Sequence, residues 1–394
     1  FGCYTVPDFI GTRYGGNLVR ACSVFVLFIA SFTYVTAQIN ATGTIASRAL
    51  GIPFEAGVWV GLISILICSM LGGMRAVTWT QVAQYIVLII AYLIPVFWIS
   101  SNVGGGIFPH LMLGDEVARL GELEQQFGLV KNSAADMKAA GVPGGLKYIS
   151  GSHSGVPEGG MAVWKYLSLA ICMMVGTASL PHILMRYFTT PSVRAARKSV
   201  AWSLFFIFLL YSSAPMLATL SKLALMDPNL PTGIIGKSIS EVQSIEWVQR
   251  WSEVKQVFIA DFNGDGILQL NEWFMRGDVV VLATPEVAGL PFVISGLVFA
   301  GGMAAAMSTA DGLVLAISNA LSHDIYYKII DPKADTAKRL LVARVLLVII
   351  GAAGAYIASF RLTSILGSVA WAFDFAMSGL FFPLVLGVWW KRAT

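Results

Sequence analysis

Charge is what this sequence has least of. Of its 394 residues, 12% are charged and 56% are hydrophobic, whereas about a quarter of an ordinary soluble domain is charged. This shortage excludes most soluble folds. Together with a net charge of only +4, it also excludes a disordered chain, a coiled coil and a nucleic-acid-binding surface. The class that remains is a polytopic membrane protein, whose partner is the lipid bilayer and not a nucleic acid.

Cysteine and histidine are also scarce, with four of each. Cys22, Cys68 and Cys172 fall in apolar segments, so we expect no disulfide framework. The histidines lack metal-ligand spacing, and no combination of nucleophile, acid and base indicates an enzyme. The sequence has neither an initial Met nor a signal peptide. It begins at Phe1 and ends at Thr394, and we expect it to be a segment of a longer protein.

Long apolar runs are abundant and predict an all-α membrane protein. A helix needs about 20 apolar residues to cross a bilayer, and the runs meet this length. Outer-membrane strands are excluded because they alternate apolar and polar residues, whereas stretches such as 86–90 and 346–350 are continuously apolar. We predict about eight spans, at residues 17–45, 54–72, 77–100, 163–185, 200–224, 290–323, 339–359 and 363–390.

The basic residues of the short loops orient these spans. Arg194 lies in the loop between the fourth and fifth spans, and Lys333 lies in the loop between the sixth and seventh. Alternating spans put both loops on one side, which the positive-inside rule identifies as the cytoplasm. The longer segments 101–162 and 225–289 then lie outside the cytoplasm, and residues 1–394 form a single transmembrane domain.

Adjacent hydroxyls lie deep in the sixth predicted span. Ser308 and Thr309 follow a run of small residues, and with a free backbone carbonyl they would form a hard-oxygen site suited to Na+. The alternative is ordinary hydrogen bonding of each hydroxyl to its own helix. Asp311 in this span and Asp374 in the eighth are costly in a membrane unless paired, hydrated or functional. The sequence leaves open whether either faces an aqueous cavity.

The fourth span contains a break, with Gly176 and Pro181 inside an apolar stretch. Broken helices of transporters bind ions and substrates near the middle of the membrane, although a Pro can equally make a purely structural kink. We select Gln38, Thr177 and Ser179 as candidate substrate contacts, with helix packing as their alternative role.

Residues 261–272 fit the calcium-loop pattern D-x-N-x-D-G-x5-E in full. Helical spacing over residues 242–260 predicts an entering helix. Extracellular calcium modules bind at about 10⁻⁴–10⁻³ M, so we expect a structural Ca²⁺ clip, with a turn-rich acidic loop as the alternative. The predicted ligands are the side chains of Asp261, Asn263, Asp265, Gln269 and Glu272 and the carbonyl of Ile267.

Several motifs, in this order, resemble the sodium/solute symporter family: Gly72-Gly73-Met74-Arg75-Ala76, Pro181-His182-Ile183-Leu184-Met185-Arg186 and Met307-Ser308-Thr309-Ala310-Asp311. The opening Tyr4-Thr5-Val6-Pro7-Asp8-Phe9 is similar to that family too. The resemblance covers nearly the whole chain and is nearest to the acetate permeases, or cation/acetate symporters. It implies a LeuT-like inverted-repeat fold in a bacterial inner membrane. The eight spans would be core helices three to ten, so the first two core helices would lie outside this chain.

The resemblance also implies a function, which is Na+-coupled symport of a small organic solute by alternating access. A short monocarboxylate such as acetate is the expected solute. The family's main sodium site is shared between the first and eighth core helices, and the eighth would contribute Ser308, Thr309 and the carbonyl of Ala305. Gln81 stands where many members have Asp, and a neutral amide favours a single coupled Na+.

Other functions are weighed against this one. A related membrane domain could sense a solute for a histidine kinase, and a symporter could carry a neutral solute such as proline or a sugar. A channel fits broken helices less well. The sequence does not address whether a small helper membrane protein accompanies the chain.

Overall fold

The computed structural model describes residues 3–103, 106, 108–127, 134–142, 147–148, 160–187, 190–362 and 364–393. All eight predicted spans fall on helices. Within these described residues, six helical segments are long and apolar enough to cross a membrane, and a seventh is added if the bent pair α6–α7 is one span. The remaining predicted span corresponds to the shorter apolar stretch Phe54–Met70.

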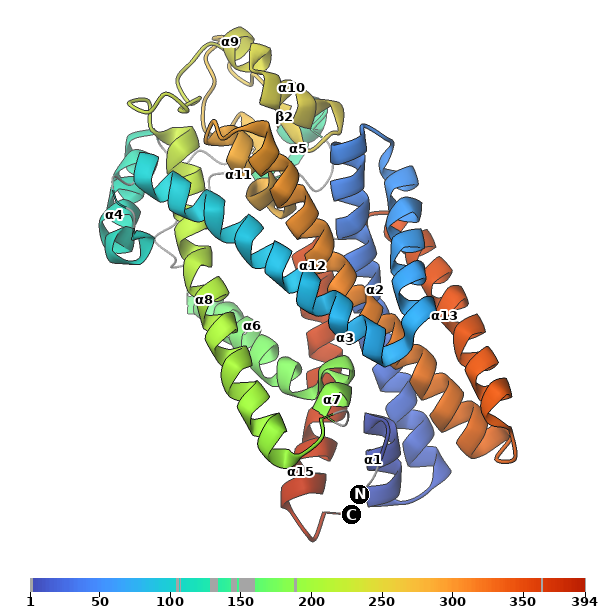
Figure 1. Cartoon of the computed structure of the whole chain (residues 1–394). Coiled ribbons are helices and arrows are strands. Elements are labelled where there is room, and N and C mark those ends of the chain that lie inside the picture. The colour runs from blue at the N-terminus through green and yellow to red at the C-terminus, as the bar shows by residue number, and fades with distance from the viewer. Residues whose placement is uncertain are drawn as a thin grey trace.

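A bundle of long helices, with several short helices that flank or continue them, forms the body of the molecule (Figure 1). Its elements are α1 (Val6–Tyr14), α2 (Asn17–Leu50), α3 (Phe54–Asn102), α6 (Gly160–Ser179), α7 (Pro181–Tyr187), α8 (Val193–Met226), α12 (Phe292–Asn319), the π-helix η2 (Ala320–Ile330), α13 (Thr336–Ser359), α14 (Ile365–Ala376), the π-helix η3 (Met377–Phe381) and α15 (Phe382–Trp389).

Local sequence signals explain several helix boundaries. The side chain of Ser192 caps α8 by accepting from the Ala195 N–H, and Asp335 caps α13 in the same way through the Lys338 N–H. The break between α6 and α7 lies at Leu180, where the two helices meet at 41°. Pro181 starts α7, and because proline has no backbone N–H it is well tolerated in the first turn of a helix.

Helix α12 lies at the centre of the bundle, against α2 and α3. Small residues permit this approach, since a Cβ built on Gly301 would lie 2.5 Å from the Cβ of Ala91 in α3. Figure 1 shows α3 bending sharply between its two apolar stretches. The double glycine Gly72-Gly73 lies between these two stretches, Phe54–Met70 and Val77–Asn102, among residues whose side chains are outside the described part of the chain.

The two segments predicted as long outside loops contain regular structure, which the hydropathy pattern did not reveal. The first holds α4 (Pro109–Phe127), α5 (Ala134–Ala139) and β1 (Lys147–Tyr148). The second holds α9 (Ile239–Ser244), α10 (Glu246–Glu253), β2 (Val257–Ile259), β3 (Trp273–Met275), the 3-10 turn η1 (Gly277–Val279) and α11 (Val280–Val287).

An antiparallel sheet of order β1-β3-β2 joins these segments, with Val257 and Lys147 both paired to Met275. The predicted entering helix over 242–260 is therefore wrong in its second half. Helix α10 ends at Glu253, and residues 257–259 pair with β3, because cross-strand pairing outweighs the helical spacing of the sequence.

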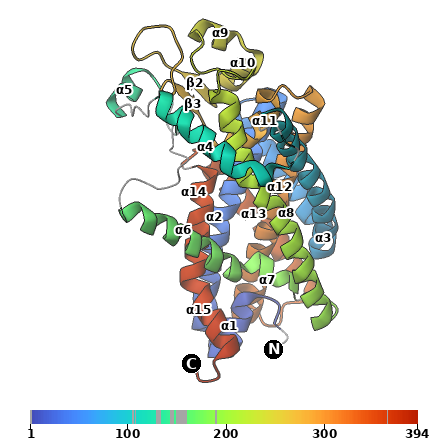
Figure 2. The same cartoon turned by 90° about the vertical axis from the view of Figure 1, so that its left-hand side faces the viewer.

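The molecule has two distinct ends. Figures 1 and 2 place both chain termini at one end, and α9, α10 and the sheet at the other. The beginning of α8, which carries basic residues, lies toward the end with the termini (Figure 1). This arrangement agrees with the alternation of spans on which the predicted orientation rests. Many apolar side chains of the bundle, among them Phe208 and Ile349, are exposed, as expected of a surface that faces lipid.

Candidate functional site

The predicted sodium ligands lie together on one turn of α12. Ser308 Oγ donates to the carbonyl oxygen of Ala305 at 2.9 Å, and Thr309 Oγ1 donates to the same oxygen at 3.3 Å. The hydroxyls thus bond to their own helix, as the alternative interpretation requires. However, a hydroxyl that donates its hydrogen keeps its lone pairs for a cation. The three residues are half-buried, so this turn presents three close oxygens without being sealed in the core.

Gln81 from α3 contacts this turn. Its Nε2 donates to the carbonyl of Ser308 at 2.5 Å, while its Oε1 is buried without a hydrogen-bond partner. On the following turn, a Cβ at Gly312 would lie 3.1 Å from a guanidinium nitrogen of Arg186. The Gln81 amide therefore adjoins the turn that carries the two hydroxyls, and the Arg186 guanidinium adjoins the next turn.

The two intramembrane aspartates differ in environment. Asp311 is fully buried, and its Oδ1 accepts a hydrogen bond from Ser69 Oγ at 3.1 Å. Asp374 is exposed. Asp311 thus does not face an open cavity, and its carboxylate instead ties α12 to the first apolar stretch of α3.

The hydroxyls of two predicted substrate contacts bond to their own helix. Thr177 Oγ1 donates to the carbonyl of Met173 at 2.6 Å, and Ser179 Oγ donates to that of Gly176 at 3.0 Å. Thr177 is exposed, Ser179 is fully buried, and Gln38 is half-buried on α2. Thr177 and Ser179 both lie in the last turn before the α6–α7 break.

Comparison with known proteins decides the family. The model of the sodium:solute symporter family matches residues 1–238 and 279–394. The chain belongs to this family. It is a multi-pass protein of the plasma membrane, and its family and fold are those of transporters.

Among curated relatives, an uncharacterized symporter of Cupriavidus necator is 38% identical, over 100% of this chain and 68% of that protein. A monocarboxylic acid transporter of Corynebacterium glutamicum is 24% identical, over 99% of this chain and 62% of that protein. An uncharacterized symporter of Bacillus subtilis is also 24% identical, over 99% and 63%. The family member described here thus spans about two thirds of the length of these relatives, or 62–68%.

A solved structure is similar across nearly the whole chain. A Na+-coupled sialic acid symporter in a substrate-bound outward-open state superposes with a TM-score of 0.63 and 16% identity, covering 99% of this chain and 67% of that one. This likeness establishes the predicted LeuT-like fold for the symporter chain.

The family model leaves residues 239–278 of this symporter unmatched, and the predicted calcium loop lies within them. Glu272 is fully buried and accepts the N–H groups of Phe262 at 2.8 Å and Gln269 at 3.0 Å, so it joins the two ends of the loop. Gly264 and Gly266 have φ of 73° and 70°. Such left-handed φ values favour glycine, and Asp261 accepts the N–H groups of Gly264 at 2.7 Å and Gly266 at 3.1 Å.

The loop carboxylates are not gathered around one point, as the ligands of a bound metal ion would be. Asp265 accepts the Ile267 N–H at 2.7 Å, and this hydrogen bond is the main reason that its pKa lies below the usual range. The carboxylates of Asp261, Asp265 and Glu272 do not all lie within 4.8 Å of one another. Calcium would therefore have to draw together groups that now accept backbone N–H groups.

An ion pair that sequence reasoning missed joins α2 to α11, and Trp251 of the unmatched segment hydrogen-bonds to it. Arg48 at the end of α2 contacts Glu286 Oε1 at 2.7 Å, and Glu286 Oε2 accepts from the indole of Trp251 in α10 at 2.6 Å. The Arg48 guanidinium also lies 5.1 Å from the centre of the Trp251 ring. Arg48 and Glu286 border a cavity of about 730 Å³ between α2, α10 and α12. In the sequence, the charge of Arg48 at the end of an apolar run is the one feature that could have indicated this ion pair.

Proposed function

We propose that this symporter moves a small organic solute together with Na+, and that the solute is a short monocarboxylate such as acetate. The observation that carries the proposal is the cluster of hydroxyl and carbonyl oxygens at Ala305, Ser308 and Thr309. Such oxygens suit a hard, weakly polarising cation, and the half-burial of the turn allows other segments of the full-length protein to complete the shell. The Na+-coupled structural neighbour and the monocarboxylic acid transporter among the relatives support this choice.

In the proposed solute site, Thr177, Ser179 and Gln38 contact the carboxylate from the α6–α7 break and from α2. Neutral hydroxyl and amide donors can bind a carboxylate without a lysine or arginine, and a broken helix frees backbone N–H groups for the same purpose. Alternating access would then expose this site to each side of the membrane in turn.

The proposal is tested with the full-length protein in proteoliposomes, using labelled acetate, pyruvate and proline with and without an inward Na+ gradient. We expect acetate and pyruvate uptake to depend on the Na+ gradient. Preferred proline uptake would instead indicate a neutral-solute symporter, and binding without uptake would indicate a sensor domain.

The neutral side chain of Gln81 leads to a prediction about the net charge that moves in each transport cycle. The amide beside Ser308 supplies no negative charge for a second cation, so one Na+ should accompany one monocarboxylate. No net charge then moves, and the membrane potential, worth about 2.3 kcal/mol per charge per 100 mV, should not affect uptake. Acetate addition to protein on a solid-supported membrane should therefore give no transient transport current. A clear inward current would contradict single-Na+ coupling.

We further propose that the 261–272 loop binds Ca²⁺ as a structural clip through Asp261, Asn263, Asp265, Gln269, Glu272 and the Ile267 carbonyl. Glu272→Gln should abolish saturable Ca²⁺ binding in the millimolar range, because it removes the carboxylate that would bind the ion with both oxygens. Titration calorimetry on the full-length protein measures this.

The control for this prediction is Glu253→Gln, the same change at an exposed position just outside the loop. It should leave binding unaltered. Equal Ca²⁺ binding by the Glu272→Gln variant and the unchanged protein would show that the loop is only a turn-rich acidic segment.

A further inference from the structure

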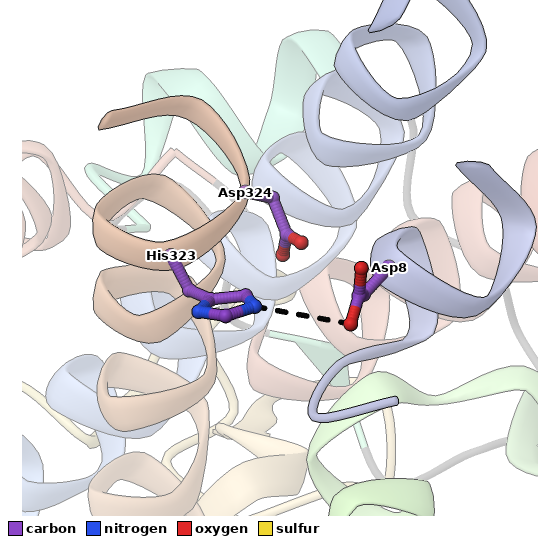
Figure 3. A group of neighbouring side chains, drawn as sticks. All are labelled: Asp8, His323 and Asp324. Atoms are coloured by element: carbon purple, nitrogen blue, oxygen red, sulfur yellow. Dashed lines mark ion pairs between the residues drawn. The ribbon is translucent and has the colours of Figure 1, made fainter. Parts of the chain in front are cut away.

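A second group of potential ligands lies at the end of the bundle opposite the calcium loop. Asp8 comes from α1, and His323 and Asp324 come from the π-helix η2, which continues α12. One ligand atom from each of the three lies within 4.8 Å of the other two. Figure 3 shows the imidazole and the two carboxylates directed toward a common space. More than 300 residues separate the two parts of this cluster, so the fold alone brings them together.

The cluster contains buried polar atoms that the protein does not satisfy. Asp324 is 0% exposed and Asp8 is 6% exposed. Asp324 Oδ1 and His323 Nε2 are both buried without a hydrogen-bond partner. A buried carboxylate oxygen without a partner costs more free energy than an ordinary lost hydrogen bond, so these atoms indicate a missing positive partner.

Neighbouring groups hold the remaining ligand atoms in place. Thr5 Oγ1 donates to Asp324 Oδ2 at 2.6 Å and accepts the Asp8 N–H at 3.1 Å. Arg20 lies 3.4 Å from Asp8 Oδ1. These contacts occupy one oxygen of each carboxylate. Of the other two oxygens, Asp324 Oδ1 has no hydrogen-bond partner, and Asp8 Oδ2 accepts a long hydrogen bond of 3.4 Å from the Tyr4 N–H. Both oxygens can still bind a ligand beside the imidazole.

We propose that Asp8, His323 and Asp324 bind a divalent transition-metal ion of the Mn²⁺ or Zn²⁺ class. One imidazole with two carboxylates is a donor set that suits these ions, whereas Ca²⁺ and Mg²⁺ take oxygen ligands almost alone. Ligands at about 2.0–2.2 Å from a metal lie roughly 3.0–3.5 Å from each other. His323 Nε2 and Asp8 Oδ2 are now 3.8 Å apart, so only a small approach is needed.

The bound ion would fasten α1 to the end of α12. Helix α1 also contacts the last helix, since Arg13 Nε donates to the Gly387 carbonyl at 3.0 Å. A metal at Asp8 would therefore stabilise the packing of α1, η2 and α15 at the end where both termini lie, independently of the calcium loop and of the proposed sodium turn.

The test measures Mn²⁺ binding to the full-length protein by the loss of the free Mn²⁺ EPR signal, in a Glu272→Gln background that removes the other candidate divalent site. We expect one Mn²⁺ per chain, displaced by Zn²⁺, and a metal-dependent rise in thermal stability. Loss of a residue that only supports a metal ligand lowers metal affinity by about tenfold or more. His323→Gln removes a ligand itself, so it should weaken Mn²⁺ binding by at least about tenfold. Asp324→Asn should do the same.

The matched control is His110→Gln, in which an exposed histidine near the other end of the molecule hydrogen-bonds Ser212. This change should leave Mn²⁺ binding intact. If Mn²⁺ and Zn²⁺ both fail to bind at millimolar concentration, or if the His323→Gln variant binds as tightly as the parent, the metal site is disproved. The cluster is then an ordinary buried ion pair.

Discussion

Replacing Ser308 by alanine is expected to raise the Na+ concentration needed for half-maximal uptake by about 5- to 150-fold. Loss of one polar partner typically costs about 1–3 kcal/mol, and this free energy corresponds to that range of affinity. The Ala305 carbonyl and Thr309 hydroxyl remain, so transport at saturating Na+ should persist in part. The measurement is acetate uptake by the full-length protein as a function of the Na+ concentration.

Ser318 offers a close control on the same helix. Its Oγ donates to the carbonyl of Leu315 at 3.1 Å, three residues back, in the way that Ser308 donates to Ala305. Ser318→Ala removes the same type of bond from a buried position outside the proposed site, and should leave the Na+ dependence unaltered. Equal effects of the two changes, or no effect of Ser308→Ala, would rule out Ser308 as a sodium ligand.

The sequence allowed this site to be predicted because its members lie within one turn of a single helix. The bundle was predictable for a similar reason, since a span is defined by the length and hydropathy of a continuous run. The sheet that joins residues 147–148 to 257–259 and 273–275 could not be predicted, because its pairing is set between distant strands. The cluster of Asp8 with His323 and Asp324 escaped prediction for the same reason.

A second large effect is expected at the buried ion pair between Lys222 and Glu124. Lys222 Nζ hydrogen-bonds Glu124 Oε1, and the two side chains are only 6% and 4% exposed. This pair links α8 to α4, a helix that hydropathy alone had assigned to a loop. Lys222→Met removes the ammonium beside a buried carboxylate, and we expect it to destabilise the protein by about 3–5 kcal/mol. Thermal unfolding of the solubilised full-length protein at one scan rate measures the loss.

The double change of Lys222→Met with Glu124→Leu should recover most of the lost stability, because removing both charges leaves neither one buried alone. As a matched single change, Lys237→Met removes an exposed pair in which Nζ lies 3.8 Å from Glu241, and should alter stability by less than about 1 kcal/mol. Comparing Lys222→Met with Lys237→Met separates the effect on stability of leaving a buried charge unpaired from the effect of losing a lysine. If Lys222→Met were no more harmful than Lys237→Met, burial would not control the energy of the α4–α8 contact, and α4 would pack onto the bundle through its apolar residues alone.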